Sequence, residues 1–134
     1  MKEEKKQHLE FIQNTITRMN TNSFQLKNLA VTITTALLAV YASSKNDTFV
    51  FIGLLPIIMF WFLDSFYLQQ ERKFRGIYND VSGITSINKI SDYEMPLHKY
   101  TSREYNYINS LISKPNFFFY ISLILIIVII WILI

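Results

Sequence analysis

Three long apolar blocks constrain this chain more than any other feature of its sequence. The last block, residues 117–134, is eighteen residues long, and only Tyr120 and Ser122 in it carry a side-chain oxygen. As a helix rising about 1.5 Å per residue, it nearly crosses a hydrocarbon core about 30 Å thick. Its many Ile, Val and Phe residues would favour a strand in water, but an isolated segment in lipid satisfies its backbone only as a helix. The block is therefore predicted to span a membrane.

The other two blocks lie close together and are predicted to form a hairpin. Residues 48–63 are apolar after the first position, and the apolar character continues past Asp64 to Leu68. Residues 29–42 are less apolar because they contain three threonines. Only residues 43–47 separate the two blocks, and so short a connection favours antiparallel neighbours. The N-terminus is too polar to be a cleavable signal peptide.

The basic residues predict which side of the membrane each part faces. Residues 1–28 hold five Lys or Arg and residues 69–116 hold seven, whereas the hairpin turn holds only Lys45. Basic residues in short loops stay in the cytoplasm, so the N-terminus is predicted inside and the C-terminus outside.

The predicted fold class is all-α, an integral membrane protein with three transmembrane helices and cytoplasmic helical extensions of the first hairpin. Its parts are a cytoplasmic amphipathic helix (1–28), a transmembrane hairpin (29–68, with spans at about 24–43 and 48–68), a cytoplasmic helix, loop and short helix (69–116), and a third transmembrane helix (117–134).

Apolar residues recur every three or four positions on both arms of the hairpin, which is the spacing of packed helices. The two seams are Leu9, Ile12, Ile16, Met19, Leu26, Ala30, Ile33, Leu37 and Val40, and Leu63, Tyr67, Gln70, Phe74, Ile77 and Val81. The polar run 20–23 could interrupt the first helix, and Gly83 is predicted to cap the second. Because each seam is in phase with its span, we expect upright, packed extensions rather than helices lying flat on the headgroups. Residues 84–100 show no strong periodicity and are predicted to be a loop or a short irregular element.

A short helix is predicted between this loop and the third span. Thr101, followed three residues later by Glu104, resembles a capping box that would start the helix. Pro115 is expected to end it, and Asn116 is expected to cap the third span.

Asp64 is the most informative charged residue, because ionisable groups near the hydrocarbon usually have partners. In a hairpin centred between residues 45 and 46, Asp64 lies opposite Lys27, so the two are predicted to form an interfacial ion pair. Two alternatives stay open: exposure of Asp64 to headgroups, or a ring of carboxylates at the mouth of an oligomeric pore.

A stripe of small residues runs along the first span, about a quarter turn from its apolar seam. Its members are Thr32, Thr35, Ala36, Ala39 and Ser43. Small residues let membrane helices approach closely and let hydroxyls bond across the contact. The stripe is a candidate for packing within the hairpin, for packing between subunits, or for a weakly polar pore lining.

The remaining polar features indicate no enzyme. Arg72, Lys73 and Arg75 follow the second span and are predicted to contact lipid headgroups and to fix the topology. His8 and His98 have no neighbours at metal-ligand spacing, and the chain has no cysteine and no glycine-rich phosphate loop. We therefore predict no catalytic activity, no cofactor and no metal, and the small net charge of +3 gives no reason to expect nucleic acid.

Two stretches carry a recognisable pattern: His8-Leu9-Glu10, Ile12-Gln13, Arg18-Met19, Asn22-Ser23-Phe24 and Leu26-Lys27, then Pro56, Ile58-Met59-Phe60-Trp61, Leu63-Asp64, Leu68 and Gln70-Glu71-Arg72, with a looser match at Ser113-Lys114 and Phe119-Tyr120. This pattern resembles a family of small bacterial multi-pass membrane proteins. The architecture is similar to that of SLATT-type two-span effectors, which accompany nucleotide-signalling anti-phage systems and are thought to breach the membrane when activated. The third span and the lack of a recognisable sensor domain depart from that pattern, so this part of the likeness is one of architecture.

The resemblance implies a protein of the bacterial inner membrane and leaves two functions open. In the first, the chain forms a homo-oligomer that acts as a pore-forming or membrane-perturbing effector in anti-phage defence. In the second, it is a non-catalytic anchor for a cytoplasmic partner protein, encoded by a neighbouring gene. In both, membrane lipids are partners. A small transporter would require more helices than one copy supplies.

Overall fold

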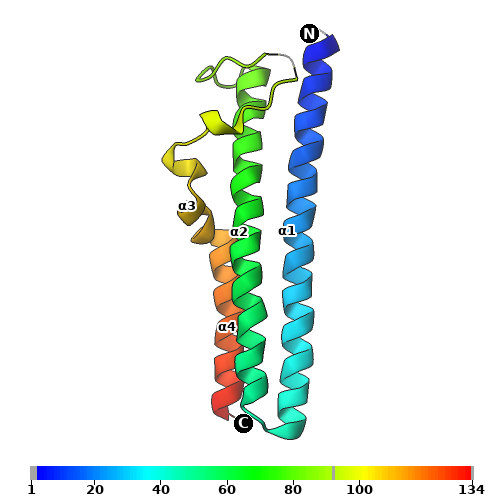
Figure 1. The fold of residues 1–134 in the computed structure, drawn as a ribbon, viewed down its shortest axis with the longest axis vertical. Coiled ribbons are helices and arrows are strands. Elements are labelled where there is room, and N and C mark those ends of the chain that lie inside the picture. The colour runs from blue at the N-terminus through cyan, green and yellow to red at the C-terminus, as the bar shows by residue number, and fades with distance from the viewer. Residues whose placement is uncertain (1–2, 92, 134) are drawn as a thin grey trace.

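A computed structural model describes residues 3–91 and 93–133 of the chain. It is a long antiparallel hairpin of α1 (Glu3–Ser44) and α2 (Thr48–Ser82), with α4 (Lys114–Leu133) packed along one half of α2 (Figure 1). Three helices among the described residues are long and apolar enough to cross a membrane. No strand occurs in this part of the chain, so the all-helical class is confirmed.

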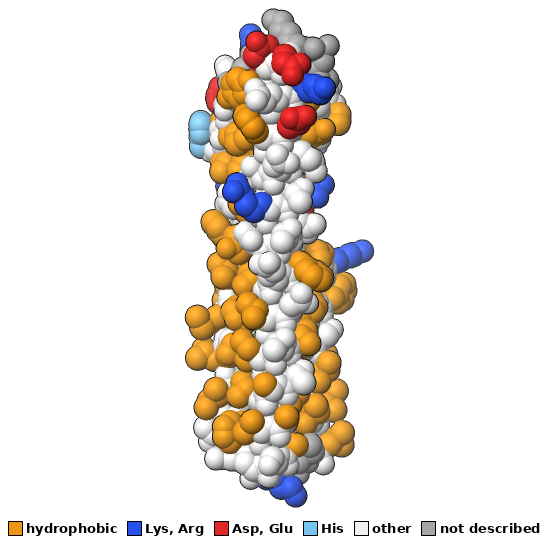
Figure 2. Space-filling view, turned by 90° about the vertical axis from the view of Figure 1, so that its right-hand side faces the viewer, with side chains coloured by type: hydrophobic (Ala, Val, Ile, Leu, Met, Phe, Trp, Pro, Cys, Tyr) orange, Lys and Arg blue, Asp and Glu red, His pale blue; other side chains and the backbone are white. Residues whose placement is uncertain are grey.

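The N-terminus and the start of the connection between α2 and α4 lie at one end of the molecule, and the connection then runs beside α2 to about the middle, where α4 begins. The hairpin turn and the C-terminal end of α4 lie at the other end (Figure 1). On the face shown in Figure 2, hydrophobic side chains cover the half nearer the turn, and most charged side chains gather at the N-terminal end. This separation is the one expected of a bundle half immersed in lipid.

The first helix is continuous from Glu3 to Ser44 and is not broken at the polar run 20–23. The two extensions pack upright against each other, as the seams predict, and form a cluster of buried residues outside the apolar half: Ile12, Ile16, Phe74, Ile77 and Tyr100. A second cluster fills the apolar half: Ala30, Tyr41, Val50, Ile57, Tyr120, Leu123 and Ile127.

The contact face of α1 differs from the predicted seam in the apolar half. There the buried positions are Ala30, Thr34 and Tyr41, whereas Val40 is 43% exposed. From Ile12 to Tyr41 the face follows the helix's own period of about 3.6 residues per turn, and a strict heptad repeat drifts away from that period. The predicted seam is therefore correct at Ala30, but its extension beyond that residue was wrong by one position.

The chain between α2 and α4 is mostly irregular. Gly83 ends α2 in the left-handed conformation with φ 88°, as predicted. The segment then contains two 3-10 turns, η1 (Leu97–Lys99) and η2 (Arg103–Tyr105), and a short helix α3 (Tyr107–Leu111).

The predicted boundaries of the short helix and the third span were wrong. Asn106, not Thr101, caps α3, since its side chain accepts a hydrogen bond from the backbone N–H of Ile108 at 3.0 Å. Pro115 lies in the first turn of α4 rather than at the end of α3. Backbone N–H groups in a first turn have no partner within the helix, so proline loses no hydrogen bond at this position. Asn116 is therefore inside α4 and is not its cap.

Residues 84–91 and 93–105 fold back over the extensions of α1 and α2. His8 Nε2 lies 2.7 Å from the carbonyl oxygen of Glu94, and the Tyr93 hydroxyl donates to Gln7 Oε1 at 2.6 Å. Tyr100 is buried against the α1–α2 contact. We call residues 84–91 and 93–105 the cap.

Gly76 allows the cap to approach α2. A β-carbon at this position would lie 2.5 Å from the Tyr105 hydroxyl oxygen and 2.8 Å from the Tyr100 ring. Gly76→Ala is expected to weaken attachment of the cap by about 1–3 kcal/mol, because overpacking forces side chains from their places. Trypsin should then cleave the cap at least fivefold faster than in the parent protein, since a cost of about 1 kcal/mol raises the open population by that factor.

Gly53→Ala is the matched control, because a β-carbon there would meet only the Leu37 side chain, with Cδ1 at an ordinary 3.4 Å and Cβ at 3.7 Å. Equal cleavage rates in the Gly76 and Gly53 variants would show that the cap is not packed on α2 as described.

Candidate functional site: a buried ion pair between the three long helices

The structure brings Lys27 of α1 and Asp64 of α2 together. Lys27 Nζ lies 2.5 Å from Asp64 Oδ2, and the side chains are 19% and 0% exposed. The pair lies at the level where α4 begins to pack on the hairpin, so it is enclosed by three helices rather than two.

Every polar atom of this pair is engaged. Lys27 Nζ donates to Asp64, to Ser23 Oγ at 2.8 Å and to Asn116 Oδ1 at 3.0 Å. Asp64 also accepts from the Ser23 hydroxyl through Oδ1 and from the Tyr120 hydroxyl through Oδ2 at 2.8 Å. Burying two charges costs several kcal/mol each in principle, and hydrogen bonds to every remaining donor and acceptor offset that cost. We call these five residues the polar network.

A second layer of contacts surrounds the polar network. Asn116 Nδ2 donates to Ser65 Oγ at 3.5 Å, and the Ser65 hydroxyl donates to the carbonyl of Trp61 at 2.8 Å. The Trp61 indole N–H donates to the carbonyl of Leu111 at 2.9 Å, and its ring stacks on Tyr120. These contacts tie α3 and α4 to the same stretch of α2.

The polar network lies near one edge of the apolar half of the molecule. Lys27, Asp64 and Asn116 are each sixteen or seventeen residues from the far end of their helix. At 1.5 Å per residue this is about 25 Å, slightly less than the thickness of a hydrocarbon core of about 30 Å. The network would therefore lie at a membrane boundary if the far ends reach the other one.

The sequence paired Lys27 with Asp64 but missed the other three members. Ser23 lies in the polar run that is predicted as a possible break in the first helix, Asn116 is predicted to cap the third span, and Tyr120 appears there only as a residue with a side-chain oxygen. The spacing of these residues is a signal that could have found them. Two residues that are four positions apart share a helix face, and this holds for Ser23 with Lys27 and for Asn116 with Tyr120.

The small-residue stripe faces away from the hairpin contact. All five members, Thr32, Thr35, Ala36, Ala39 and Ser43, are exposed. Packing within the hairpin, one of the three predicted roles, is therefore wrong for this stripe, because the buried side of α1 carries Ala30, Thr34 and Tyr41 instead. Packing between subunits and pore lining stay as predictions.

The basic residues after the apolar half are partly engaged within the protein. Arg75 forms an ion pair with Glu71 at 2.7 Å, and Arg72 Nη1 donates to Asn109 Oδ1 at 3.3 Å. Both arginines line a cavity of about 360 Å³ between α2 and α3. Contact of Arg72, Lys73 and Arg75 with lipid headgroups stays a prediction.

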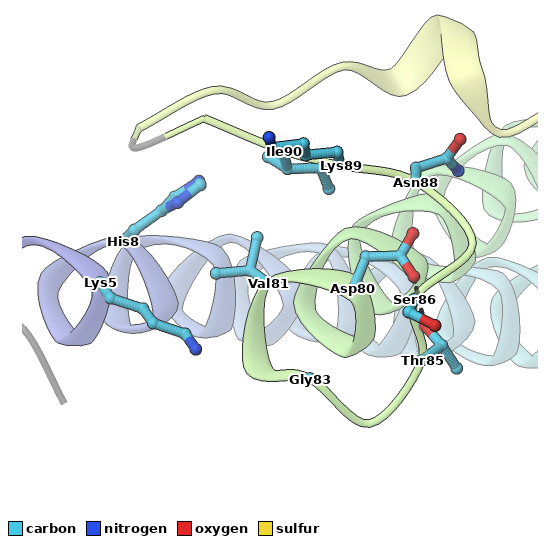
Figure 3. A pocket seen from close by; sticks show the side chains of 10 residues that line it. All are labelled: Lys5, His8, Asp80, Val81, Gly83, Thr85, Ser86, Asn88, Lys89 and Ile90. Carbon is cyan, nitrogen blue, oxygen red and sulfur yellow. Dashed lines mark hydrogen bonds between the residues drawn. The ribbon is translucent and has the colours of Figure 1, made fainter.

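A polar cavity of about 420 Å³ lies at the end of α2, lined by Lys5 and His8 of α1, Asp80 of α2, and Thr85 and Lys89 of the cap, among others (Figure 3). Asp80 accepts hydrogen bonds from the hydroxyls of Thr85 and Tyr100, the latter at 2.6 Å. Burial opposes ionisation of Asp80, but these hydrogen bonds outweigh it and lower the pKa of its carboxyl group. The carboxylate therefore holds the cap in place, and its contribution to stability is lost as pH falls through that lowered pKa.

Among residues 3–91 and 93–133, no group of three His, Asp or Glu side chains is placed to hold a metal ion. Comparison with protein-family models, curated proteins and solved structures finds no match to this chain. The likeness to SLATT-type effectors thus stays a resemblance of architecture.

Proposed function

We propose that this chain is a multi-pass protein of the bacterial inner membrane, with its N-terminus and cap in the cytoplasm. The three long apolar helices and the gathering of charge at one end support this placement. The distribution of Lys and Arg supports the orientation, because residues 1–28 and 69–116 hold all but one of them.

This topology predicts opposite results for two reporter fusions. A reporter fused after Ile134 should be active outside the cytoplasm, and a reporter inserted near Asn88 should be active inside, because basic residues retain the cap on the inner side. Activity of both reporters on the same side would mean that one of the three helices does not cross the membrane.

We further propose that the protein is a non-catalytic, membrane-perturbing effector that acts as a homo-oligomer in anti-phage defence. The observation that carries this proposal is the exposed stripe on α1. A single copy of three helices encloses no water path, whereas several copies meeting at their stripes would place the hydroxyls of Thr32, Thr35 and Ser43 around a common axis. The role in defence rests on the resemblance to SLATT-type effectors.

A cytoplasmic anchor is the second candidate, and one observation favours it. Ile84 and Ile87 of the cap are 71% and 81% exposed at the end farthest from the apolar half. Large apolar side chains held in water can mark a contact with another protein. In this role the membrane helices would hold a cytoplasmic partner, such as the product of a neighbouring gene.

Induced expression in a bacterial host with a membrane-potential dye separates the two functions. The effector is expected to collapse the potential within minutes of its accumulation in the membrane, because an open water path carries ions. An unchanged potential, together with release of a bound cytoplasmic protein on deletion of residues 1–26, would contradict the effector and establish the anchor.

A further inference from the structure

An apolar groove of about 590 Å³ lies on the exposed side of α2, where α3 packs beside it. Its lining residues are Met59, Phe60, Phe62, Leu63, Phe66 and Tyr107. The Tyr107 hydroxyl is the one polar side-chain group in this lining, and it donates to the carbonyl of Phe62 at 2.6 Å. The groove therefore offers a polar ligand no side-chain partner, and it suits a hydrocarbon chain.

The groove lies at the level where the apolar half of the molecule begins. Asp64, which marks that level, belongs to the same stretch of α2, and α3 runs beside this stretch because Trp61 donates to the carbonyl of Leu111 (Figure 1). Ile108 and Ile112 are four residues apart and are both exposed. Exposed apolar side chains at this level fit the zone where acyl chains meet headgroups. In the proposed membrane placement, the groove therefore opens toward the acyl chains of the inner leaflet.

Lys73 supplies a positive charge above the groove. It follows Phe66 by seven residues, nearly two helical turns, so it lies on the same face of α2 and about 10 Å closer to the cytoplasm. Lysine side chains near the end of a membrane helix extend toward the headgroups. Among the described residues the Lys73 ammonium group forms no ion pair, whereas Arg75 is paired with Glu71. A lipid phosphate would supply the missing negative charge.

We propose that this groove binds one acyl chain of an anionic phospholipid, and that Lys73 binds the phosphate group of the same lipid. The preference for an anionic lipid follows from charge complementarity, since a cationic headgroup would compete with Lys73 for the phosphate. The proposal rests on the proposed membrane placement and is independent of the effector activity.

Native mass spectrometry of the full chain in detergent micelles measures the affinity for the first lipid molecule. The probes are phosphatidylglycerol and phosphatidylcholine with identical acyl chains. The protein is expected to bind phosphatidylglycerol at least fivefold more tightly. Lys73→Gln should abolish this preference. Met59→Trp fills the groove from an exposed position, so it should weaken binding of both lipids at least threefold.

Each variant has a matched control outside the groove. Lys114→Gln removes an exposed lysine at the start of α4, and Leu125→Trp adds the same indole ring at an exposed position of α4. Both controls should keep the two affinities within twofold of the parent protein.

Equal affinity of the parent protein for the two lipids, or equal losses in a variant and its control, overturns the lipid site. A dimer that Met59→Trp abolishes assigns the groove to a second copy and overturns the site as well. An unchanged membrane potential on expression contradicts the effector but does not alter these affinities, so failure of the lipid site and failure of the proposed function are distinguishable.

Discussion

Replacing Asp64 with alanine is expected to destabilise the folded protein by about 3–5 kcal/mol. The substitution leaves the Lys27 ammonium group buried without its counter-ion, and it leaves the hydroxyls of Ser23 and Tyr120 without their acceptor. Denaturant unfolding in detergent micelles, followed by circular dichroism, measures the loss. Asp47→Ala is the control, because Asp47 is an exposed carboxylate at the hairpin turn that accepts from the indole N–H of Trp131 and forms no ion pair among the described residues.

Exchanging the two charges tests whether the pair acts as a unit. The combined Lys27→Asp and Asp64→Lys variant should recover at least half of the stability lost in Asp64→Ala. The amide of Asn116 can turn to donate to the relocated carboxylate, and the hydroxyl oxygen of Tyr120 can accept from the relocated ammonium group. If the exchange recovers none of the lost stability and changes which ions cross the membrane, Asp64 instead belongs to a carboxylate ring at a pore mouth.

Replacing Thr32 and Thr35 with leucine is expected to reduce membrane permeability by at least tenfold while membrane insertion is unchanged. Both threonines are exposed on the outward face of α1, so leucine creates no clash inside the monomer. In an oligomer built around the stripe, the larger leucine side chains would keep neighbouring helices from approaching closely. They would also remove the threonine hydroxyls from the water path. Dye release from vesicles containing the purified protein measures this effect.

Ser122→Leu is the corresponding control on α4, where the hydroxyl is exposed and bonds only to the carbonyl of Phe118 in its own helix. Permeability that survives the Thr32 and Thr35 substitutions, or that falls equally with Ser122→Leu, would mean that the stripe is not where copies meet.

Sequence reasoning predicted the parts of the fold that depend on local pattern. Long apolar runs predicted the helices, and the short turn set the register that places Lys27 opposite Asp64. It could not place the heptad in the apolar half correctly, because nearly every residue there is apolar and the pattern no longer distinguishes one face from another. The drift from Val40 to Tyr41 follows from helix geometry rather than from hydrophobicity.

The third helix shows a different limit. Its own hydrophobicity predicts a span but contains no information about which neighbour it packs against. Asn116 and Tyr120 acquire their roles only when α4 meets the hairpin, which depends on the fold of the irregular segment before it. That segment is held by contacts between distant residues, such as Tyr100 with Asp80 and Trp61 with Leu111, and these contacts leave no periodic signal in the sequence.

Cysteine crosslinking in native membranes tests most directly whether copies of this protein meet at the stripe. Ala36→Cys places a single thiol in the middle of the stripe, and Met59→Cys places one on the exposed apolar surface of α2, which is 61% exposed at this residue. Under mild oxidation the Ala36 variant is expected to form covalent dimers in most of its population, because every copy in the oligomer brings this position close to a neighbour. The Met59 variant is expected to stay monomeric. Monomers in both variants, or dimers in equal amounts, would contradict an oligomer built around α1.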